Sequence, residues 1–216
     1  MIPLFHDLST KRVVVIGGGR VALRKARRFA DETHLTVISP AFHDGFDALD
    51  CELVYERVDE RTIGDYLDEV FLVVPATGDT ELNGRLAMVA DRAGCLVNRV
   101  DRPDPDGADS AGVTGDVIVP GTIHTEEITV AIATGGSSPA TSKYLRRRLE
   151  PIIHEADPMV RLQRDLREEL KRTVDTSEER KQRLWTVIED EGVWNALADD
   201  YETARSLARE HVGLEP

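Results

Sequence analysis

Cysteines and long apolar runs are scarce in this 216-residue sequence, and basic residues are outnumbered by acidic ones. Lysine and arginine number 27 against 40 aspartates and glutamates, which gives a formal net charge of −13. Nucleic acids and anionic membranes both require a positive protein face, so neither is expected as a partner. No apolar run approaches the roughly 20 residues of a bilayer-spanning helix. We therefore expect a soluble globular protein.

The N-terminus and the cysteines suggest a reducing compartment. Residues 1–7 lack the basic start and the long apolar stretch of a secretory signal, so a cytoplasmic location is expected. The only cysteines, Cys51 and Cys95, lie far apart in mostly apolar surroundings and have no CxxC spacing. We predict buried thiols that form neither a disulfide nor a zinc site.

The first hundred residues alternate apolar runs with amphipathic stretches. Strands are predicted at residues 12–16, 35–38, 52–55, 70–74 and 95–98, and the continuous apolar run at 12–16 is the pattern of a strand covered on both faces, as in a parallel sheet. Apolar positions recur at helical spacing over residues 21–30 and 81–93. The alternation predicts an α/β domain with a doubly wound parallel sheet over residues 1–112, in which each strand is followed by a crossover of the same kind.

The composition changes after residues 102–116, which are rich in proline, glycine and aspartate. A β-hairpin is predicted from residues 117–123 and 128–133, and a helix is predicted to follow it. Ser138 is placed to cap that helix and Pro139 to occupy its first position. Residues 113–150 are therefore assigned to a hairpin-plus-helix region.

Residues 151–216 are assigned to a C-terminal helical domain. Thr176 begins a Thr-Ser-Glu-Glu sequence that fits a helix-capping box. Apolar residues at helical spacing predict core faces for these helices, and the residues are Leu162, Leu166, Leu170, Leu184, Trp185 and Ile188.

Three glycines follow the first predicted strand, and Gly17-x-Gly19-x-x-Ala22 matches the fingerprint of dinucleotide-binding βαβ units. The first glycine permits a tight turn, the second lets backbone N–H groups approach a diphosphate, and the small third residue lets the helix pack on the strand. The fold is thus expected to be Rossmann-like. Cofactor contacts are predicted at Gly17, Gly19, Arg20, Val21, Ser39, Pro40, Ala41, Ala76 and Thr77.

The second strand of such units usually ends in an acidic residue that binds the ribose hydroxyls. Ser39 occupies that place here, so neither a carboxylate that would repel a 2′-phosphate nor an arginine that would attract one is present. We predict NAD as the cofactor. The missing acid also argues against an ordinary alcohol dehydrogenase.

Several ordered motifs resemble one family. The Gly17–Lys25 string is followed by Pro75-Ala76-Thr77, Asn98-Arg99-Val100-Asp101, Val119-Pro120-Gly121 and the segment from Thr134 to Pro139, with Arg146 and Glu150 beyond. Over about residues 1–150 the sequence resembles the precorrin-2 dehydrogenase family, the N-terminal module of siroheme synthase. The resemblance implies NAD-dependent removal of a hydride and protons from precorrin-2 to give sirohydrochlorin in siroheme biosynthesis. It also implies a homodimer, with the hairpin region as the dimerisation and substrate region.

The resemblance implies Asp101 as the general base. An acid at the carboxyl end of a parallel strand could accept a proton beside the cofactor. The alternative is that Asp101 only caps the turn that follows. Because the substrate carries many carboxylates, substrate contacts are proposed for Arg24, Lys143 and Arg146.

Other functions are left open by the sequence. Some relatives also insert ferrous iron into sirohydrochlorin, for which Asp101 and His124 are the candidates, but no metal ligand set is predicted because His124 has no second histidine at ligand spacing. A non-catalytic NAD-sensing module, as in cation transporters, shares the sheet and the glycine turn but usually keeps the acid that Ser39 replaces. A fused synthase would need a methyltransferase module of well over 200 residues, so methylation is expected from another protein.

Overall fold

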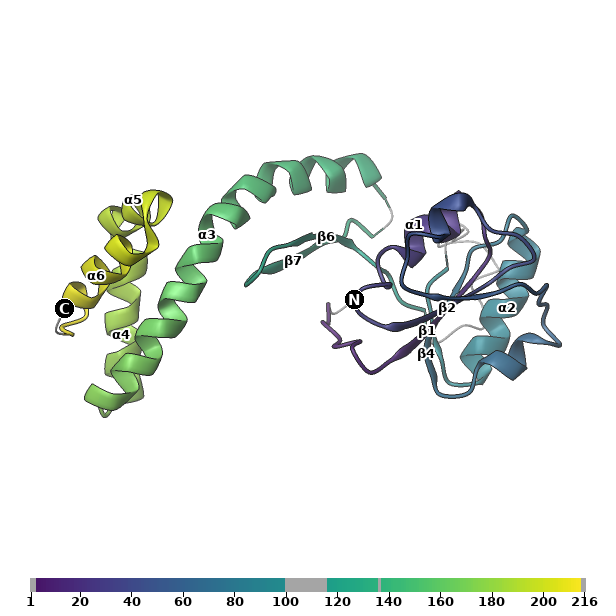
Figure 1. Cartoon of the computed structure of the whole chain (residues 1–216), viewed down its shortest axis with the longest axis horizontal. Helices are drawn as coiled ribbons and strands as arrows, with labels where there is room; N and C mark the ends of the chain where they lie inside the picture. The colour runs from purple at the N-terminus through teal and green to yellow at the C-terminus, as the bar shows by residue number, and fades with distance from the viewer. Residues whose placement is uncertain (1–2, 100–115, 136, 215–216) are drawn as a thin grey trace. The chain divides into compact units, whose positions relative to one another are not determined.

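The computed structural model describes residues 3–99, 116–135 and 137–214 of the chain (Figure 1). They fall into two compact units, Met1–Val119 and Pro120–Pro216. The proposed base, Asp101, lies outside the described residues. No helix in the described ranges is long and apolar enough to cross a membrane.

The first unit contains a five-stranded sheet in the order β3-β2-β1-β4-β5. Its strands are β1 (Arg12–Ile16), β2 (His34–Ile38), β3 (Glu52–Val54), β4 (Val70–Pro75) and β5 (Leu96–Val97). Every neighbouring pair is parallel. This confirms the predicted Rossmann-like sheet, and the strand order matches the first five strands of the 3-2-1-4-5-6 order of the dinucleotide-binding fold.

The continuous apolar run of β1 reflects burial on both faces of the sheet. Val13 and Val15 pack on one face with α1 (Arg20–Ala26), while Val14 and Ile16 pack on the other in the cluster that also contains apolar residues of α2 (Thr80–Arg92). All four valine and isoleucine side chains are buried. A strand covered on both sides has no polar face, which explains why its sequence does not alternate.

The crossovers beyond the first βα unit differ from the expected pattern. The connections around β3 contain only the 3-10 turns η1 (Asp44–Phe46) and η2 (Ile63–Tyr66), so the prediction of the same crossover after every strand was wrong there. The first connection contains Pro40 and Gly45, and proline and glycine are the poorest helix formers. The first helix, α1, also ends at Ala26 and not at Ala30.

The second unit begins with the antiparallel hairpin of β6 (Gly121–His124) and β7 (Thr129–Ile132). The hairpin confirms the prediction, but its first strand starts four residues later than expected. Val117 belongs to the first unit, where its N–H donates to the Val97 carbonyl at 2.8 Å. Pro120 has no N–H to continue a strand from there.

Four helices complete the second unit: α3 (Pro139–Thr173), α4 (Ser177–Ile188), α5 (Glu191–Asp199) and α6 (Tyr201–His211). Both predicted caps are present, because the Ser138 hydroxyl accepts from the Thr141 N–H and the Thr176 hydroxyl accepts from the Glu179 N–H. Helix α3 runs through residue 150, and the domain boundary proposed there stays a prediction. It curves along its length (Figure 1), as expected of a helix with internal prolines.

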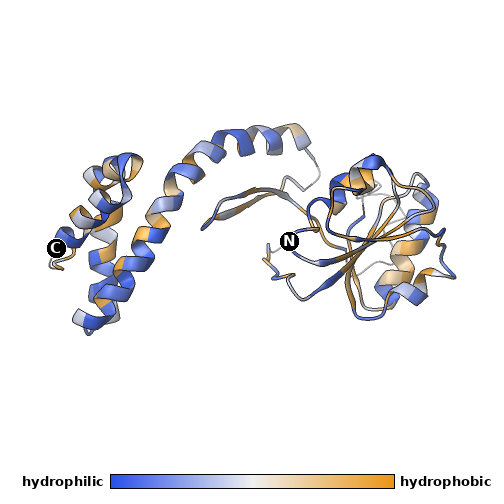
Figure 2. Ribbon diagram, in the orientation of Figure 1, coloured by the Kyte–Doolittle hydropathy of each residue, from blue (hydrophilic) through white to orange (hydrophobic). Residues whose placement is uncertain are grey.

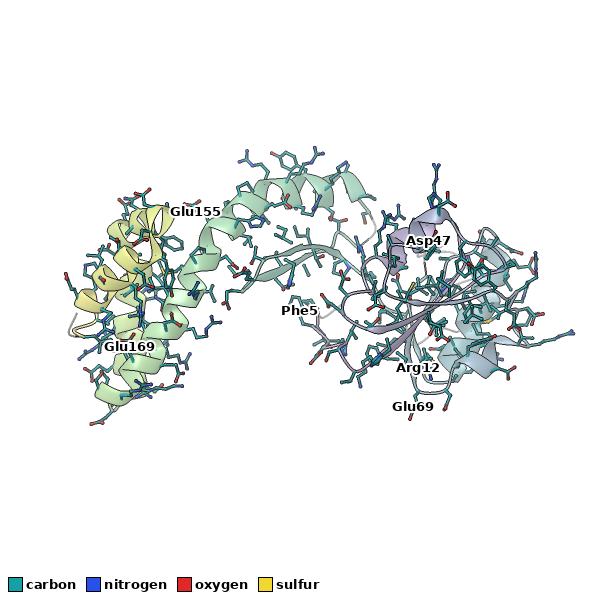
Figure 3. The ribbon with its side chains drawn as sticks, viewed as in Figure 1. Phe5, Arg12, Asp47, Glu69, Glu155 and Glu169 are labelled. Carbon is teal, nitrogen blue, oxygen red and sulfur yellow. The ribbon has the colours of Figure 1, made fainter. Side chains whose placement is uncertain are left out.

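The middle and the C-terminal part of α3 have different neighbours. Near its middle, Asp157 accepts from the Glu127 N–H at 3.0 Å, and Arg164 forms a bidentate ion pair with the Glu127 carboxylate, so both residues hold the hairpin turn. Farther along, Glu169 (labelled in Figure 3) accepts from Arg205 and Arg209 of α6. These contacts fix the hairpin and the helices of this unit on one long helix.

Helix α3 is amphipathic, with hydrophilic and hydrophobic residues interleaved along it (Figure 2). Its predicted core residues, Leu162, Leu166 and Leu170, are all fully buried. The prediction for Trp185 was wrong, since this side chain is 57% exposed and donates to the Glu189 carboxylate at 2.8 Å. The apolar face of α4 runs instead through Leu184, Val187 and Ile188, at the spacing of one helical face.

Candidate cofactor-binding site

A cleft of about 530 Å³ opens in the first unit where β1, β2 and β4 end. In open α/β sheets this carboxyl edge is the usual place for a ligand. Its lining contains most of the predicted cofactor contacts, and they are Gly17, Gly19, Arg20, Val21, Ser39, Pro40, Ala76 and Thr77. Ala41 is the one predicted contact outside the lining.

The three glycines that open the cleft have different roles. Gly17 has a φ of +124°, and a Cβ there would lie 2.5 Å from the Ala76 carbonyl oxygen. A Cβ on Gly18 would lie 1.8 Å from the Ala41 carbonyl oxygen, although Gly18 is not one of the fingerprint positions. A Cβ on Gly19 would meet nothing within 4 Å. Gly17 and Gly18 therefore allow close backbone packing, whereas Gly19 leaves open space on the side of the cleft.

The loop after β2 is folded back on the glycine turn. The Ser39 hydroxyl donates to the Ala41 carbonyl at 2.8 Å, and the His43 N–H donates to the Gly18 carbonyl at 2.8 Å. Ala41 thus lies behind the turn, where its carbonyl packs against Gly18. Ala41 therefore supports the wall of the cleft from behind, which explains why it does not line the cleft.

The loop after β4 is held by a residue that the sequence analysis did not identify. Asn83 of α2 is only 2% exposed, and its Oδ1 accepts from the Thr77 N–H at 3.0 Å and from the Thr77 hydroxyl at 2.7 Å. The same amide donates to the Thr77 carbonyl at 3.2 Å. One buried side chain therefore holds the backbone N–H, the carbonyl and the hydroxyl of Thr77 at the rim of the cleft.

The cleft also contains charged residues that were not predicted. Glu56 and Arg57 follow β3, and Asp79 precedes α2. The Tyr66 hydroxyl donates to the Glu56 carboxylate, and this hydrogen bond raises the pKa of Tyr66. The position of Glu56 and Arg57 in the sequence could have predicted this, because the residues after β3 reach the same edge of the sheet as Ser39, which follows β2.

Lys25 ends the Gly17–Lys25 string, and its side chain lies half-buried against the end of β5. Its Nζ donates to the Asn98 Oδ1 at 2.6 Å, and Asn98 is 4% exposed. Burial, followed by repulsion from Arg28 and Arg24, lowers the pKa of Lys25 to about 8. Lys25 therefore changes its charge closer to neutral pH than an ordinary lysine does.

The residues proposed for the substrate are spread over both units. Arg24 is exposed on α1, whereas Lys143 and Arg146 lie on α3 of the second unit, where Arg146 pairs with Glu150 at 3.6 Å. The His124 ring bonds the Thr129 hydroxyl across the hairpin at 2.7 Å. Within the described ranges no group of three or more His, Cys, Asp or Glu side chains could hold a metal ion. Cys95 is buried as predicted, whereas Cys51 is only partly buried, and burial raises the pKa of both thiols.

Comparison with known proteins identifies the family. Residues 4–107 match a family described as "Putative NAD(P)-binding". Precorrin-2 dehydrogenase of Methanosarcina barkeri is 35% identical over 215 residues, which cover 96% of this chain and 91% of that protein. The chain belongs to the precorrin-2 dehydrogenase family. The alignment includes the helical tail, which resembled the family only loosely in sequence.

Two further matches agree with membership of this family. A siroheme synthase of Tolumonas auensis is 37% identical over 153 residues, which are 70% of this chain and 30% of that longer protein. The solved structure of SirC, a precorrin-2 dehydrogenase, superimposes with a TM-score of 0.72 over 97% of this chain and 100% of that one. At 21% identity this second match shows the shared fold. As a precorrin-2 dehydrogenase family member, the chain is an NAD(P)-dependent oxidoreductase.

Proposed function

We propose that this enzyme oxidises precorrin-2 to sirohydrochlorin with NAD as the hydride acceptor, as a step of siroheme biosynthesis. The near full-length match to a precorrin-2 dehydrogenase carries the proposal, since it includes both units of the chain. A two-electron oxidation of this kind removes one hydride and one proton. The enzyme must therefore hold an acceptor for each of them.

We assign the cleft of the first unit to the cofactor. The open side of Gly19, together with the backbone of Arg20 and Val21, fits the approach of a diphosphate to backbone N–H groups. Bound NAD would supply the hydride acceptor. Ser39 gives the ribose a neutral neighbour at the end of β2, and the Thr77 peptide held by Asn83 forms the opposite rim. NAD in preference to NADP is part of the proposal.

Asp101 is proposed as the general base, and Arg24, Lys143 and Arg146 as contacts of the substrate carboxylates. In sequence, Asp101 follows Asn98 at the carboxyl end of β5, which pairs with β4 beside the cleft. A carboxylate delivered from that edge could accept the proton as the hydride leaves. Arginine and lysine suit the polycarboxylate substrate because they form charge-assisted hydrogen bonds.

The reaction is tested by mixing the purified protein with enzymatically made precorrin-2 and either NAD or NADP. We expect reduced cofactor to form, with an absorbance change that follows sirohydrochlorin, and faster turnover with NAD. Tight cofactor binding without turnover would support the sensing module instead. Ferrous iron added in a second stage reports separately on chelation.

We also expect a homodimer. Strands β6 and β7 pair only with each other among the described strands, and Tyr144 and Ile152 of α3 are 61% and 58% exposed. Light scattering at micromolar concentration should give twice the chain mass. Ile152→Lys should lower that mass if this face joins the two copies, whereas Trp185→Lys, at an exposed site on α4, should not. A monomeric wild-type protein would contradict the prediction.

A further inference from the structure

The Lys25 side chain connects three parts of the first unit through Asn98. The Lys25 Nζ on α1 donates to the Asn98 Oδ1 at 2.6 Å, and the Asn98 Nδ2 donates to the Val117 carbonyl at 2.7 Å. The backbones of Asn98 and Val117 are also bound to the sheet, because the Asn98 N–H donates to the Val73 carbonyl and the Val117 N–H donates to the Val97 carbonyl. One amide side chain therefore joins the end of β5 to the segment at Val117.

The orientation of this amide follows from the chemistry of its partners. An ammonium group can only donate and a peptide carbonyl can only accept, so the oxygen of Asn98 must face Lys25 and its nitrogen must face Val117. Both polar atoms of a side chain that is 4% exposed are then satisfied. Loss of either partner would leave a buried polar atom without a hydrogen bond, which is costly.

The environment of Lys25 provides little compensation for its charge. Arg24 on α1 and Arg28 in the turn after it repel the ammonium group, and Asn98, which faces it from the end of β5, is neutral. No carboxylate forms an ion pair with Lys25 among the residues that the structure describes. The hydrogen bond to Asn98 is therefore the interaction that holds the cation in place.

We propose that Lys25 is a positioning residue for the dehydrogenation, which acts through Asn98 on the backbone at the carboxyl end of β5. The inference rests on the proposed function, because the proposed base follows Asn98 by three positions in the sequence. Lys25 is not part of the cleft lining, so its effect should fall on turnover and not on cofactor binding. The ammonium form is the active one, since a charge-assisted hydrogen bond is stronger than that of a neutral amine.

Lys25→Met and Lys25→Arg test this role, with Arg27→Met as the control at an exposed site of the same helical segment. Lys25→Met should lower kcat for precorrin-2 oxidation by about 10- to 100-fold, the usual cost of misplacing a reacting group. Its Kd for NAD should match that of the wild-type protein. Lys25→Arg should retain most of the activity because arginine keeps the charge and the donor. Unchanged kcat in Lys25→Met would overturn the proposal.

The pH profile separates positioning from a merely structural role. Because Lys25 has a pKa near 8, wild-type kcat should fall as the pH rises through that value, when the ammonium loses its proton. In Lys25→Arg the side chain stays charged near pH 8, so kcat should no longer fall as the pH rises through that value. A limb near pH 8 that persists in Lys25→Arg would contradict the proposal.

A spectroscopic measurement needs no substrate and remains available if Lys25→Met fails to fold. The side-chain amide resonances of Asn98 should titrate near pH 8 in the wild-type protein and should not do so in Lys25→Arg. A flat Asn98 titration in the wild-type protein would overturn the inference. Absence of precorrin-2 oxidation by the wild-type protein, with the Asn98 titration intact, would count against the proposed function instead.

Discussion

Asp101→Ala is expected to lower the rate of precorrin-2 oxidation by about 10²- to 10⁴-fold, the range that a positioned general base contributes. The proton must leave the substrate as the hydride departs, and Asp101→Ala removes the carboxylate proposed to accept it. Single-turnover kinetics with saturating NAD measure this step directly. Cofactor affinity should stay unchanged, because the substitution leaves the glycine turn and the described strand ends that line the cleft as they are.

The control for this experiment is Asp104→Ala, which removes a carboxylate from the same proline-rich segment. It should keep nearly full activity, so that a loss confined to Asp101→Ala is assigned to that carboxylate and not to the segment. Asp101→Asn adds a second comparison, because it keeps the shape of the side chain but removes the base. A fully active Asp101→Asn would exclude the general-base role.

The core of the first unit was predictable because burial leaves a direct mark on sequence. Val13 to Ile16 are apolar at successive positions, as expected of a strand covered on both faces. The turn that follows was predictable for a similar reason, since Gly17 has a positive φ that other residues rarely adopt. The crossovers around β3 carried no such mark, and there the expected repetition was wrong.

Contacts between distant segments were not predictable from one sequence. Asn83 holds Thr77 through hydrogen bonds that span six positions, but nothing in the sequence distinguishes it from an exposed asparagine on a helix. Lys25 similarly lies in a run of basic residues that suggests a solvated face, yet it reaches Asn98, 73 positions away. Such residues are recognised only when the fold brings their partners together.

Gly18→Ala is expected to impair both the fold and cofactor binding. The added methyl would lie 1.8 Å from the Ala41 carbonyl oxygen and 2.8 Å from the Ser39 hydroxyl. Because the Ala41 carbonyl belongs to the backbone, relief requires the loop after β2 to move away from the glycine turn, with strain on the hydrogen bond from His43 to Gly18. Overpacking of this kind costs about 1–3 kcal/mol of unfolding free energy. Urea denaturation measures that loss, and titration with NAD measures the accompanying loss of affinity.

Gly19→Ala is the matched comparison, one position along the chain. Its methyl would meet no protein atom within 4 Å, and Gly19 already has an ordinary φ of −84°. The unfolding free energy should therefore fall by less than in Gly18→Ala, with only the modest cost of alanine at a helix N-cap. Cofactor affinity should still fall, by about tenfold or ~1.4 kcal/mol, because the methyl would occupy the space through which a diphosphate approaches the backbone.

The pair separates the two reasons for which a glycine turn needs glycine. If Gly18 is required for close backbone packing and Gly19 for ligand approach, the unfolding free energy should fall mainly in Gly18→Ala. The affinity for NAD should fall in both variants. Equal unfolding free energies for the two variants would contradict the close approach of Ala41 to Gly18. Unchanged NAD affinity in Gly19→Ala would instead place the diphosphate away from this turn, and the cofactor assignment of the cleft would then fail.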